Sequence, residues 1–294
     1  MSNAEKPVIV VVGSLHYDIM VDAPDRPRKG ETVTGHGWRP KFGGKGGNQA
    51  VAAAQAGARV RMAGAVGDDE FGRFLLEALQ AGGVEAAHVR KLAGIGSGMS
   101  VAISDAGGDY GAVIVSGANL HLDPAHLEEA DLWRDVRALI LQNEIPDRLN
   151  LAAAGAAHRV GATVCLNAAP FRPLSDELVA LVDLLVVNAL EAEALSAVPV
   201  TDLASATKAA QALAARFPIA IVTAGDAGVA AMAPGQPPVA LEALPVELVS
   251  THGAGDAFMG TLVAALAAGG SFAQSLAQAN RMAAAHVSRR PEPL

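Results

Sequence analysis

The middle of the chain alternates short apolar runs with longer segments in which apolar residues recur at helical spacing. The predicted elements are, in chain order, strand 136–145, helix 148–161, strand 163–169, helix 176–182, strand 184–189, helix 203–217 and strand 219–225. Repeated strand–helix pairs are typical of a parallel sheet, because each helix carries the chain back across one face of the sheet to the next strand. We therefore predict an α/β fold with a central, mostly parallel sheet and helices on both faces.

The N-terminal part of the chain follows this alternation only in places. Strand 8–14, helix 43–57, strand 59–67 and helix 69–83 fit it, whereas the extended segments 17–23 and 31–42 and the hairpin 99–117 do not. We expect these three segments to form a small β-sheet that projects from the main one. No long linker or internal repeat is present, so residues 1–294 are expected to form a single domain, with projecting segments at about 17–41 and 97–116. A hairpin-like segment at 228–249 and two Ala-rich helices complete the chain.

Composition excludes several classes of partner and location. The formal net charge of -8 argues against nucleic acid or an anionic membrane surface as the main partner. The single cysteine, Cys165, cannot form a disulfide within one chain, which suits a reducing cytoplasm. No uninterrupted apolar stretch is long enough for a membrane span, and the first residues lack the pattern of a signal peptide. We expect a cytoplasmic protein.

The stretch "THGAGDAFMG" (251–260) places three small residues and an acid before an apolar helix. A Gly-rich helix start leaves backbone N–H groups free at the positive end of the helix dipole, which favours an anion. Gly253, Ala254 and Gly255 would hold a transferring phosphoryl group there, while Asp256 takes a proton from an attacking hydroxyl. The simpler alternative is that Asp256 only interacts with the helix dipole.

A second Gly-rich stretch, "FGGKGGNQA" (42–50), also begins a predicted helix. It lacks the spacing of a Walker A loop, and no dinucleotide-binding fingerprint follows the first strand. It is either a flexible turn or a site where the backbone approaches a polar ligand closely, with Lys45 and Asn48 supplying hydrogen bonds.

Other candidate residues follow predicted strands, where parallel sheets gather their ligands. Asn188 and Glu191 either hold a hydrated Mg²⁺ or form a capping box at a helix start. Thr223, Gly225 and Gly228 form either a tight turn into the hairpin or a nucleotide-binding edge. Glu144 is either a solvated acid at a strand end or a functional carboxylate.

Several motifs together resemble the ribokinase-like (PfkB-type) carbohydrate kinases. They are, in order, "GSLHYD", "KGETVTG", "FGGKGGNQAVAAAQAG", "GAVGDDEFG", "VNALEAE", "VTAGDAG" and "THGAGDAF". The likeness runs from Val8 to about Arg290. It implies an ATP-dependent kinase that acts on a primary hydroxyl of a sugar, such as ribose or a similar pentose, with the projecting sheet as a lid over the sugar and a homodimer formed through the lids.

The resemblance also implies residue roles. Asp256 would be the general base, and Gly253, Ala254 and Gly255 the anion hole for the γ-phosphoryl group. Asn188 and Glu191 would hold Mg²⁺ through water. The nucleotide would be bound by Asn188, Thr223, Gly225, Gly228 and Asn280. The sugar would be held by His16, Asp18, Gly44, Lys45, Asn48 and Glu144.

Three departures from the family pattern keep alternatives open. His16 stands where related sequences usually carry Asn, so the preferred sugar need not be ribose. Ser250 stands where many members carry Asp and use it for a monovalent cation, which leaves K⁺ dependence open. The chain also stops at "VSRRPEPL", where the family usually continues. The alternatives are a nucleoside or other polyol kinase and a catalytically weak sugar- or nucleotide-binding regulator.

Overall fold

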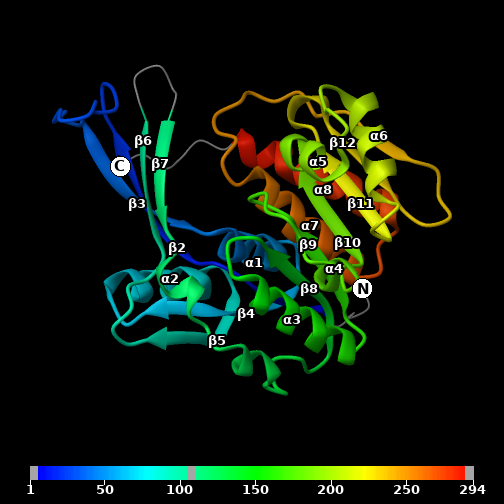
Figure 1. The fold of residues 1–294 in the computed structure, drawn as a ribbon, viewed down its shortest axis with the longest axis horizontal. Helices are drawn as coiled ribbons and strands as arrows, with labels where there is room; N and C mark the ends of the chain where they lie inside the picture. Colours follow the sequence, from blue (N-terminus) through cyan, green and yellow to red (C-terminus); the bar gives the residue numbers. More distant parts are fainter. Residues whose placement is uncertain (1–5, 105–109, 289–294) are drawn as a thin grey trace.

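The computed structural model describes residues 6–104 and 110–288. Its main sheet has nine strands in the order β13-β12-β11-β10-β9-β8-β1-β4-β5 (Figure 1). The strands are β1 (Val8–Val12), β4 (Arg59–Gly67), β5 (Val84–Leu92), β8 (Val136–Gln142), β9 (Thr163–Asn167), β10 (Leu184–Asn188), β11 (Ile219–Thr223), β12 (Val229–Met232) and β13 (Val239–Leu241). The seven strands from β11 across to β5 pair in parallel with their neighbours, and β12 and β13 add an antiparallel edge. The predicted fold class is confirmed.

Helices cover both faces of this sheet because the side chains of its buried strands alternate between two cores. In β1, Val8, Val10 and Val12 belong to one core, and Ile9 and Val11 to the other. The first core is covered by α3 (Asp147–Arg159), α4 (Asp176–Val179), α5 (Ala189–Ser196) and α6 (Leu203–Leu213). The second is covered by α1 (Lys45–Gln55), α2 (Glu70–Ala81), α7 (Ala254–Ala267) and α8 (Phe272–Val287).

The strand order reverses next to β1. The chain passes from β1 to β4 on one side, and later returns to place β8 on the other side. Ligands of open α/β sheets bind at such a reversal, just beyond the carboxyl ends of the strands. We therefore expect a ligand site near the residues that follow β1 and β8.

A second, smaller sheet projects from the first (Figure 1). Its strands are β2 (His16–Asp22), β3 (Gly37–Gly43), β6 (Met99–Ser104) and β7 (Tyr110–Val115), in the order β3-β2-β6-β7. The outer pairs are antiparallel and the β2–β6 pair is parallel. These strands come from the predicted projecting segments, although residues 31–36 are not in a strand. The turn of the predicted hairpin, 105–109, lies outside the described residues.

Some expected elements differ from the structure. Strand β5 was not predicted, because "VEAAHVRKL" mixes polar and small residues at the edge of the sheet. In the segment 228–249, β12 and β13 pair as a hairpin, but residues 242–249 are not in a strand. Short 3₁₀ turns lie at Gly117–Leu120, Pro124–Glu128 and Gly225–Ala227. Within the described ranges, no helix combines the length and the apolar character needed to cross a membrane.

Candidate active site

The reversal of strand order brings two distant polar residues together. Ser14 follows β1 and Glu144 follows β8, and the Ser14 hydroxyl donates to Oε2 of Glu144 at 2.5 Å. The backbone N–H of Lys45, the first residue of α1, donates to the same oxygen at 2.8 Å. Glu144 is thus a fixed acceptor at the start of α1 and not a solvated strand-end acid.

The glycines of "FGGKGGNQA" allow close backbone contacts. Gly44 has φ +86°, and a Cβ there would lie 2.8 Å from backbone atoms of Ser14, Leu15 and His16. A Cβ on Gly46 would lie 2.6 Å from the Ser14 backbone nitrogen. A side chain at either position would force α1 away from the end of β1. The glycines therefore place the first turn of α1 against the strand reversal.

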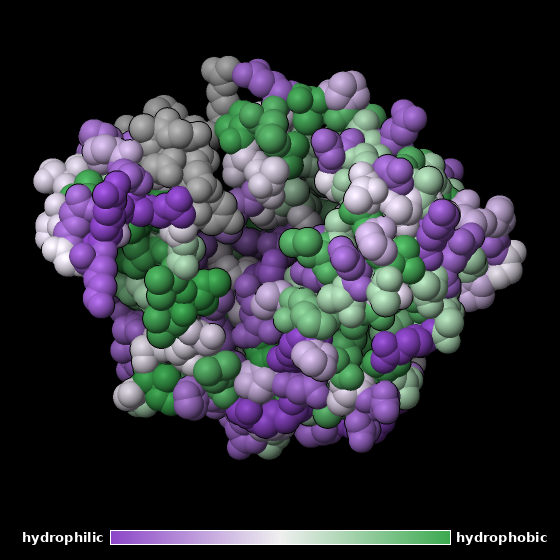
Figure 2. Space-filling view, turned by 45° about the horizontal axis from the view of Figure 1, so that its top comes forward, coloured by the Kyte–Doolittle hydropathy of each residue, from purple (hydrophilic) through white to green (hydrophobic). Residues whose placement is uncertain are grey.

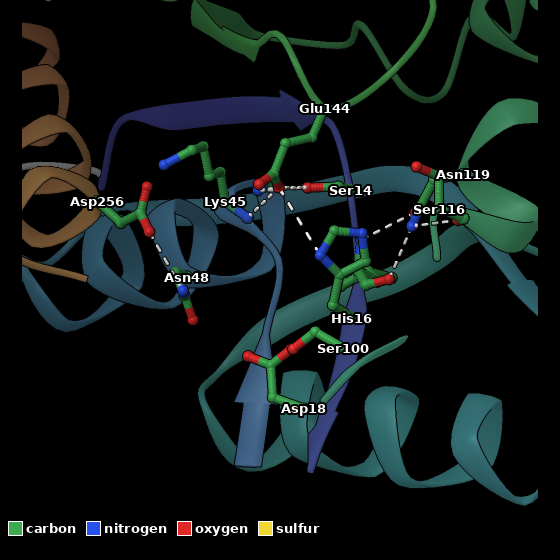
Figure 3. Close-up of polar contacts among 12 residues, drawn as sticks. Ser14, His16, Asp18, Lys45, Asn48, Ser100, Ser116, Asn119, Glu144 and Asp256 are labelled. Carbon is green, nitrogen blue, oxygen red and sulfur yellow. Dashed lines mark hydrogen bonds and ion pairs between the residues drawn. The ribbon is translucent and has the colours of Figure 1, made fainter. Parts of the chain in front are cut away.

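Asp256 lies in the first turn of α7, which begins at the N-cap Gly253 with φ +87°. The carboxylate is buried and receives one hydrogen bond on each oxygen. Oδ1 accepts from Gln49 Nε2 at 2.9 Å, and Oδ2 accepts from Asn48 Nδ2 at 3.2 Å. Both donors come from α1, which brings the two Gly-rich motifs together at Asn48 and Asp256 (Figure 3).

The electrostatic environment of Asp256 suits a general base. Burial raises the pKa of its carboxyl above the ordinary value, while the charge of Lys45 and the hydrogen bonds from Gln49 and Asn48 act in the opposite direction. The Lys45 side chain extends toward Asp256 (Figure 3). A carboxylate with a raised pKa is a stronger proton acceptor than an ordinary Asp side chain.

Part of the expected anion hole is free to accept a ligand. The Ala254 N–H donates to the Thr251 carbonyl at 3.3 Å. Within the described residues, the N–H groups of Gly253 and Gly255 make no hydrogen bond, so they remain available at the start of α7.

The small sheet contributes the expected sugar-side residues from β2. Asp18 is buried, and its Oδ1 accepts from the Ser100 hydroxyl of β6 at 2.5 Å. A Cβ on Gly43 would lie 2.0 Å from the other carboxylate oxygen, so Gly43 makes room for Asp18. Lys41 pairs with Asp18 across β3 and β2, and burial lowers the pKa of Lys41 while the charge of Asp18 opposes that effect.

His16 lies at the base of β2 and points toward Glu144 (Figure 3). Its Nδ1 is 4.0 Å from Oε2 of Glu144. Its Nε2 is enclosed and has no hydrogen-bond partner in the part of the chain that the structure describes. Gly98 makes room for the ring, because a Cβ there would lie 2.7 Å from Cδ2 of His16. The imidazole thus lies next to the fixed carboxylate of Glu144.

Asn188 and Glu191 form the predicted capping box at the start of α5. Oδ1 of Asn188 accepts from the Glu191 N–H at 2.9 Å, and Oε2 of Glu191 accepts from the Asn188 N–H at 2.9 Å. Glu191 is buried, which raises the pKa of its carboxyl. The nearby charge of Lys45 opposes this rise, as it does at Asp256.

The geometry around Glu191 fits a metal that is held mainly through water. No three His, Cys, Asp or Glu side chains in the described parts of the chain are grouped so that they could hold a metal ion. No hydrogen bond to Oε1 of Glu191 is present among these residues, so that oxygen can accept from a water. Mg²⁺ usually keeps several waters and binds few protein ligands, so a capping box and a metal site are compatible here.

The expected nucleotide residues continue along the same edge of the sheet. Thr223 ends β11 opposite Asn188 of β10. Gly225 and Gly228 have φ +59° and +114°, and a Cβ on Gly228 would lie 2.1 Å from the Leu241 carbonyl oxygen. Asn280 of α8 donates to the Glu242 carbonyl at 2.9 Å. Gly228 and Asn280 thus border the start of the loop that follows β13.

Gln49 and Asn167 were not expected from the sequence. Gln49 Nε2 donates to Oδ1 of Asn167 at 3.0 Å as well as to Asp256. Asn167 is the last residue of β9, so it lies at the carboxyl end of a strand, where the predicted residues also lie. Gln49 could have been found from its place beside Asn48 in the Gly-rich motif.

Figure 2 shows a hollow with hydrophilic residues at its floor between the two sides of the molecule.

Comparisons with known proteins agree with this geometry. The model of the pfkB family of carbohydrate kinases matches residues 6–291. A ribokinase of Bacillus subtilis is 36% identical over 281 residues, which cover 95% of this chain and 92% of the relative. A deoxyribokinase of Salmonella typhimurium is 33% identical over 256 residues, covering 86% and 83%.

A solved structure shows the same fold. The structure of Arabidopsis thaliana ribokinase complexed with ribose and ATP matches with a TM-score of 0.89 and 29% identity, covering 97% of this chain and 94% of that one. The family match spans nearly the whole chain and includes the Gly-rich start of α1 and the start of α7. The chain therefore belongs to the pfkB family of carbohydrate kinases, phosphotransferases whose acceptor is an alcohol group.

Proposed function

We propose that the protein is an ATP-dependent kinase that transfers the γ-phosphoryl group to a primary hydroxyl of ribose or a similar pentose. The observation that carries this proposal is the position of Asp256, buried at the start of α7 between free backbone N–H groups and donors from α1. The Arabidopsis thaliana ribokinase was solved with ribose and ATP, and another relative is a deoxyribokinase, which supports a small sugar and this donor.

In the proposed reaction the sugar hydroxyl lies against Oδ2 of Asp256. This oxygen is the better candidate for the proton because its protein donor, Asn48, is half-buried and 3.2 Å away. The hydroxyl proton moves to Oδ2 as the hydroxyl oxygen bonds to the γ-phosphorus. The bond from that phosphorus to the ADP oxygen breaks, and its electron pair leaves with ADP.

The charge that develops on the phosphoryl oxygens is offset by this chain's own groups. The free N–H groups at Gly253 and Gly255 donate to the phosphoryl oxygens at the positive end of α7. Lys45, whose charge acts on both Asp256 and Glu191, adds a positive charge. Mg²⁺, held through water by Asn188 and Glu191, would neutralise charge on the phosphates when bound. Thr223, Gly225, Gly228 and Asn280 would border the nucleotide.

The sugar would lie between the small sheet and the start of α1. Asp18 and Glu144 offer carboxylate oxygens to hydroxyl groups, and Gly44, Lys45 and Asn48 line the other side. His16, whose Nδ1 lies 4.0 Å from Glu144, would help to hold the sugar, and a side chain that bonds one particular hydroxyl discriminates strongly against analogues without it. The small sheet would act as a lid, and its exposed Trp38 and Val113 would form a homodimer interface.

The test is an assay of ADP release with ribose, deoxyribose, other pentoses and nucleosides, with Asp256→Asn as the control. We expect release with ribose or a related pentose that is nearly lost in the variant. Release with nucleosides alone would instead favour a nucleoside kinase. If no acceptor stimulates release while ATP still binds, the proposal is wrong and a binding role is favoured.

A further inference from the structure

A line of buried amides connects the catalytic carboxylate to the main sheet. Asn167 Nδ2 donates to the Val186 carbonyl oxygen of β10 at 3.1 Å. Asn167 Oδ1 accepts from Gln49 Nε2, which also donates to Oδ1 of Asp256. The line joins the end of β9, the first turns of α1 and the start of α7.

The direction of each hydrogen bond in this line is determined by the Val186 carbonyl. A backbone carbonyl only accepts, so Asn167 must present its NH₂ group to Val186 and its oxygen to Gln49. Gln49 must therefore present its own NH₂ group, and that group has two hydrogens, one for Asn167 and one for Asp256. The orientation of the Gln49 amide is thus specified by the β10 backbone and not by Asp256 alone.

Burying these amide groups lowers the stability of the fold wherever one of their polar atoms lacks a hydrogen-bond partner. Gln49 and its bond to Asp256 are buried, and Oε1 of Gln49 has no hydrogen-bond partner among the described residues. An unpartnered buried acceptor destabilises a fold, and an apolar side chain of similar length would fill the same space without that cost. Packing alone therefore does not explain a glutamine at this position.

Helix packing also brings Gln49 to Asp256. Gly260 lies one turn after Asp256 on α7, and a Cβ there would lie 2.5 Å from the Gln49 carbonyl oxygen. The two helices touch through their backbones at this point, so the Gln49 side chain reaches the carboxylate from a rigid support.

We infer that Gln49 is a positioning residue for the general base, holding Oδ1 of Asp256 so that Oδ2 faces the acceptor hydroxyl. The hydrogen bond also favours the ionised carboxylate, in opposition to burial. The other charged groups that act on Asp256 are Lys45 at the start of α1, Lys41 on β3 and Glu144 after β8. This inference rests on the proposed function, in which Asp256 is the base.

The test compares Gln49→Met with the wild-type full-length chain. We expect kcat for the sugar to fall by about 10- to 100-fold, the usual effect of a small misplacement of a catalytic group, with a much smaller change in KM. We also expect the acid limb of the kcat/KM profile to move to higher pH, because the ionised form of Asp256 loses a donor. Gln55→Met, on the exposed side of the same helix, is the matched control and should change neither.

A second readout does not depend on activity. ¹³C NMR of Asp carboxyl groups, assigned with Asp256→Asn, follows the titration of Asp256 in the free protein, and Gln49→Met should move it to higher pH. If both the acid limb and this titration stay at their wild-type positions, the inference is wrong, even if kcat falls, because the role is then only packing. If no acceptor is phosphorylated, the proposed function fails and the NMR titration still decides whether Gln49 holds Asp256.

Asn167→Leu provides a variant outside α1 in case Gln49→Met does not fold. It leaves Gln49 in place but removes the group that orients its amide. We expect the same direction of change with a smaller size, and no further loss when it is combined with Gln49→Met. Additive losses in the double variant would contradict a line that acts through Gln49.

Discussion

Glu191→Gln separates the two roles that the structure gives to one carboxylate. Glu191 accepts the Asn188 N–H as part of the capping box, and the proposal also assigns it a water of the Mg²⁺ shell. The amide oxygen of Gln can make the same capping bond, since Gln replaces Glu in this motif. It lacks the negative charge with which Glu191 would attract a cation and its water shell. The substitution therefore preserves the cap and removes the metal role.

The size of each effect follows from the structure. Outer-shell partners of a metal typically change its affinity by about 10- to 100-fold, so we expect the Mg²⁺ concentration at half-maximal rate to rise by about that factor. Stability should not fall. Burial raises the pKa of Glu191, so the fold disfavours the ionised form, and a neutral side chain removes that cost at neutral pH. Asn188→Ala, in contrast, loses the cap and should cost about 0.5–2 kcal/mol, which corresponds to a Tm lower by a few degrees.

The assay is a Mg²⁺ titration of initial rates at saturating sugar, with Tm measured on the same samples. Glu193→Gln is the matched control, because it removes an exposed charge from the same helix. An unchanged Mg²⁺ dependence in Glu191→Gln would refute the metal role and leave only capping. A clear fall in Tm would show that Gln does not maintain the cap.

Three further predictions concern the base, the sugar and the lid. Asp256→Asn should lower turnover by about 10²–10⁴-fold, as steady-state kinetics would show. It should also raise Tm in thermal unfolding, since the fold raises the pKa of this carboxyl and the ionised form therefore lowers stability as pH rises through that pKa. His16→Asn should raise kcat/KM for ribose relative to the preferred sugar, and an unchanged ratio would mean that His16 does not read the sugar. Light scattering at micromolar concentration should show a dimer, and Val113→Glu on the exposed lid strand should give monomer, whereas a monomeric wild type would argue against lid pairing.

The sequence predicted much of the fold because its regular part is strongly periodic. The buried parallel strands are continuous apolar runs, as sheets covered on both faces require. Strand β5 escaped prediction because the edge of a sheet needs no such run, and "VEAAHVRKL" mixes charged and small residues. On the small sheet, Val113 is exposed, whereas Ile19 and Val101 are half-buried.

The candidate site was predictable only where a local motif marked it. Asp256 and Asn48 lie in Gly-rich helix starts, and Glu191 lies three residues after a capping Asn, so spacing alone singled them out. Gln49 and Asn167 gain their roles from contacts between elements, which periodicity does not reveal. The departure noted at the chain end falls on residues 289–294, outside the described residues.

The contacts of the site join residues that are far apart along the chain. Ser14 and Glu144 are separated by 130 positions, and Asn48 and Asp256 by 208. Contacts of such separation form late, after most loop-closure entropy has been lost. Because the site needs α7 docked on α1, we expect the regain of activity during refolding to lag behind the recovery of secondary structure. For this protein, phosphoryl transfer serves as a measure of complete folding.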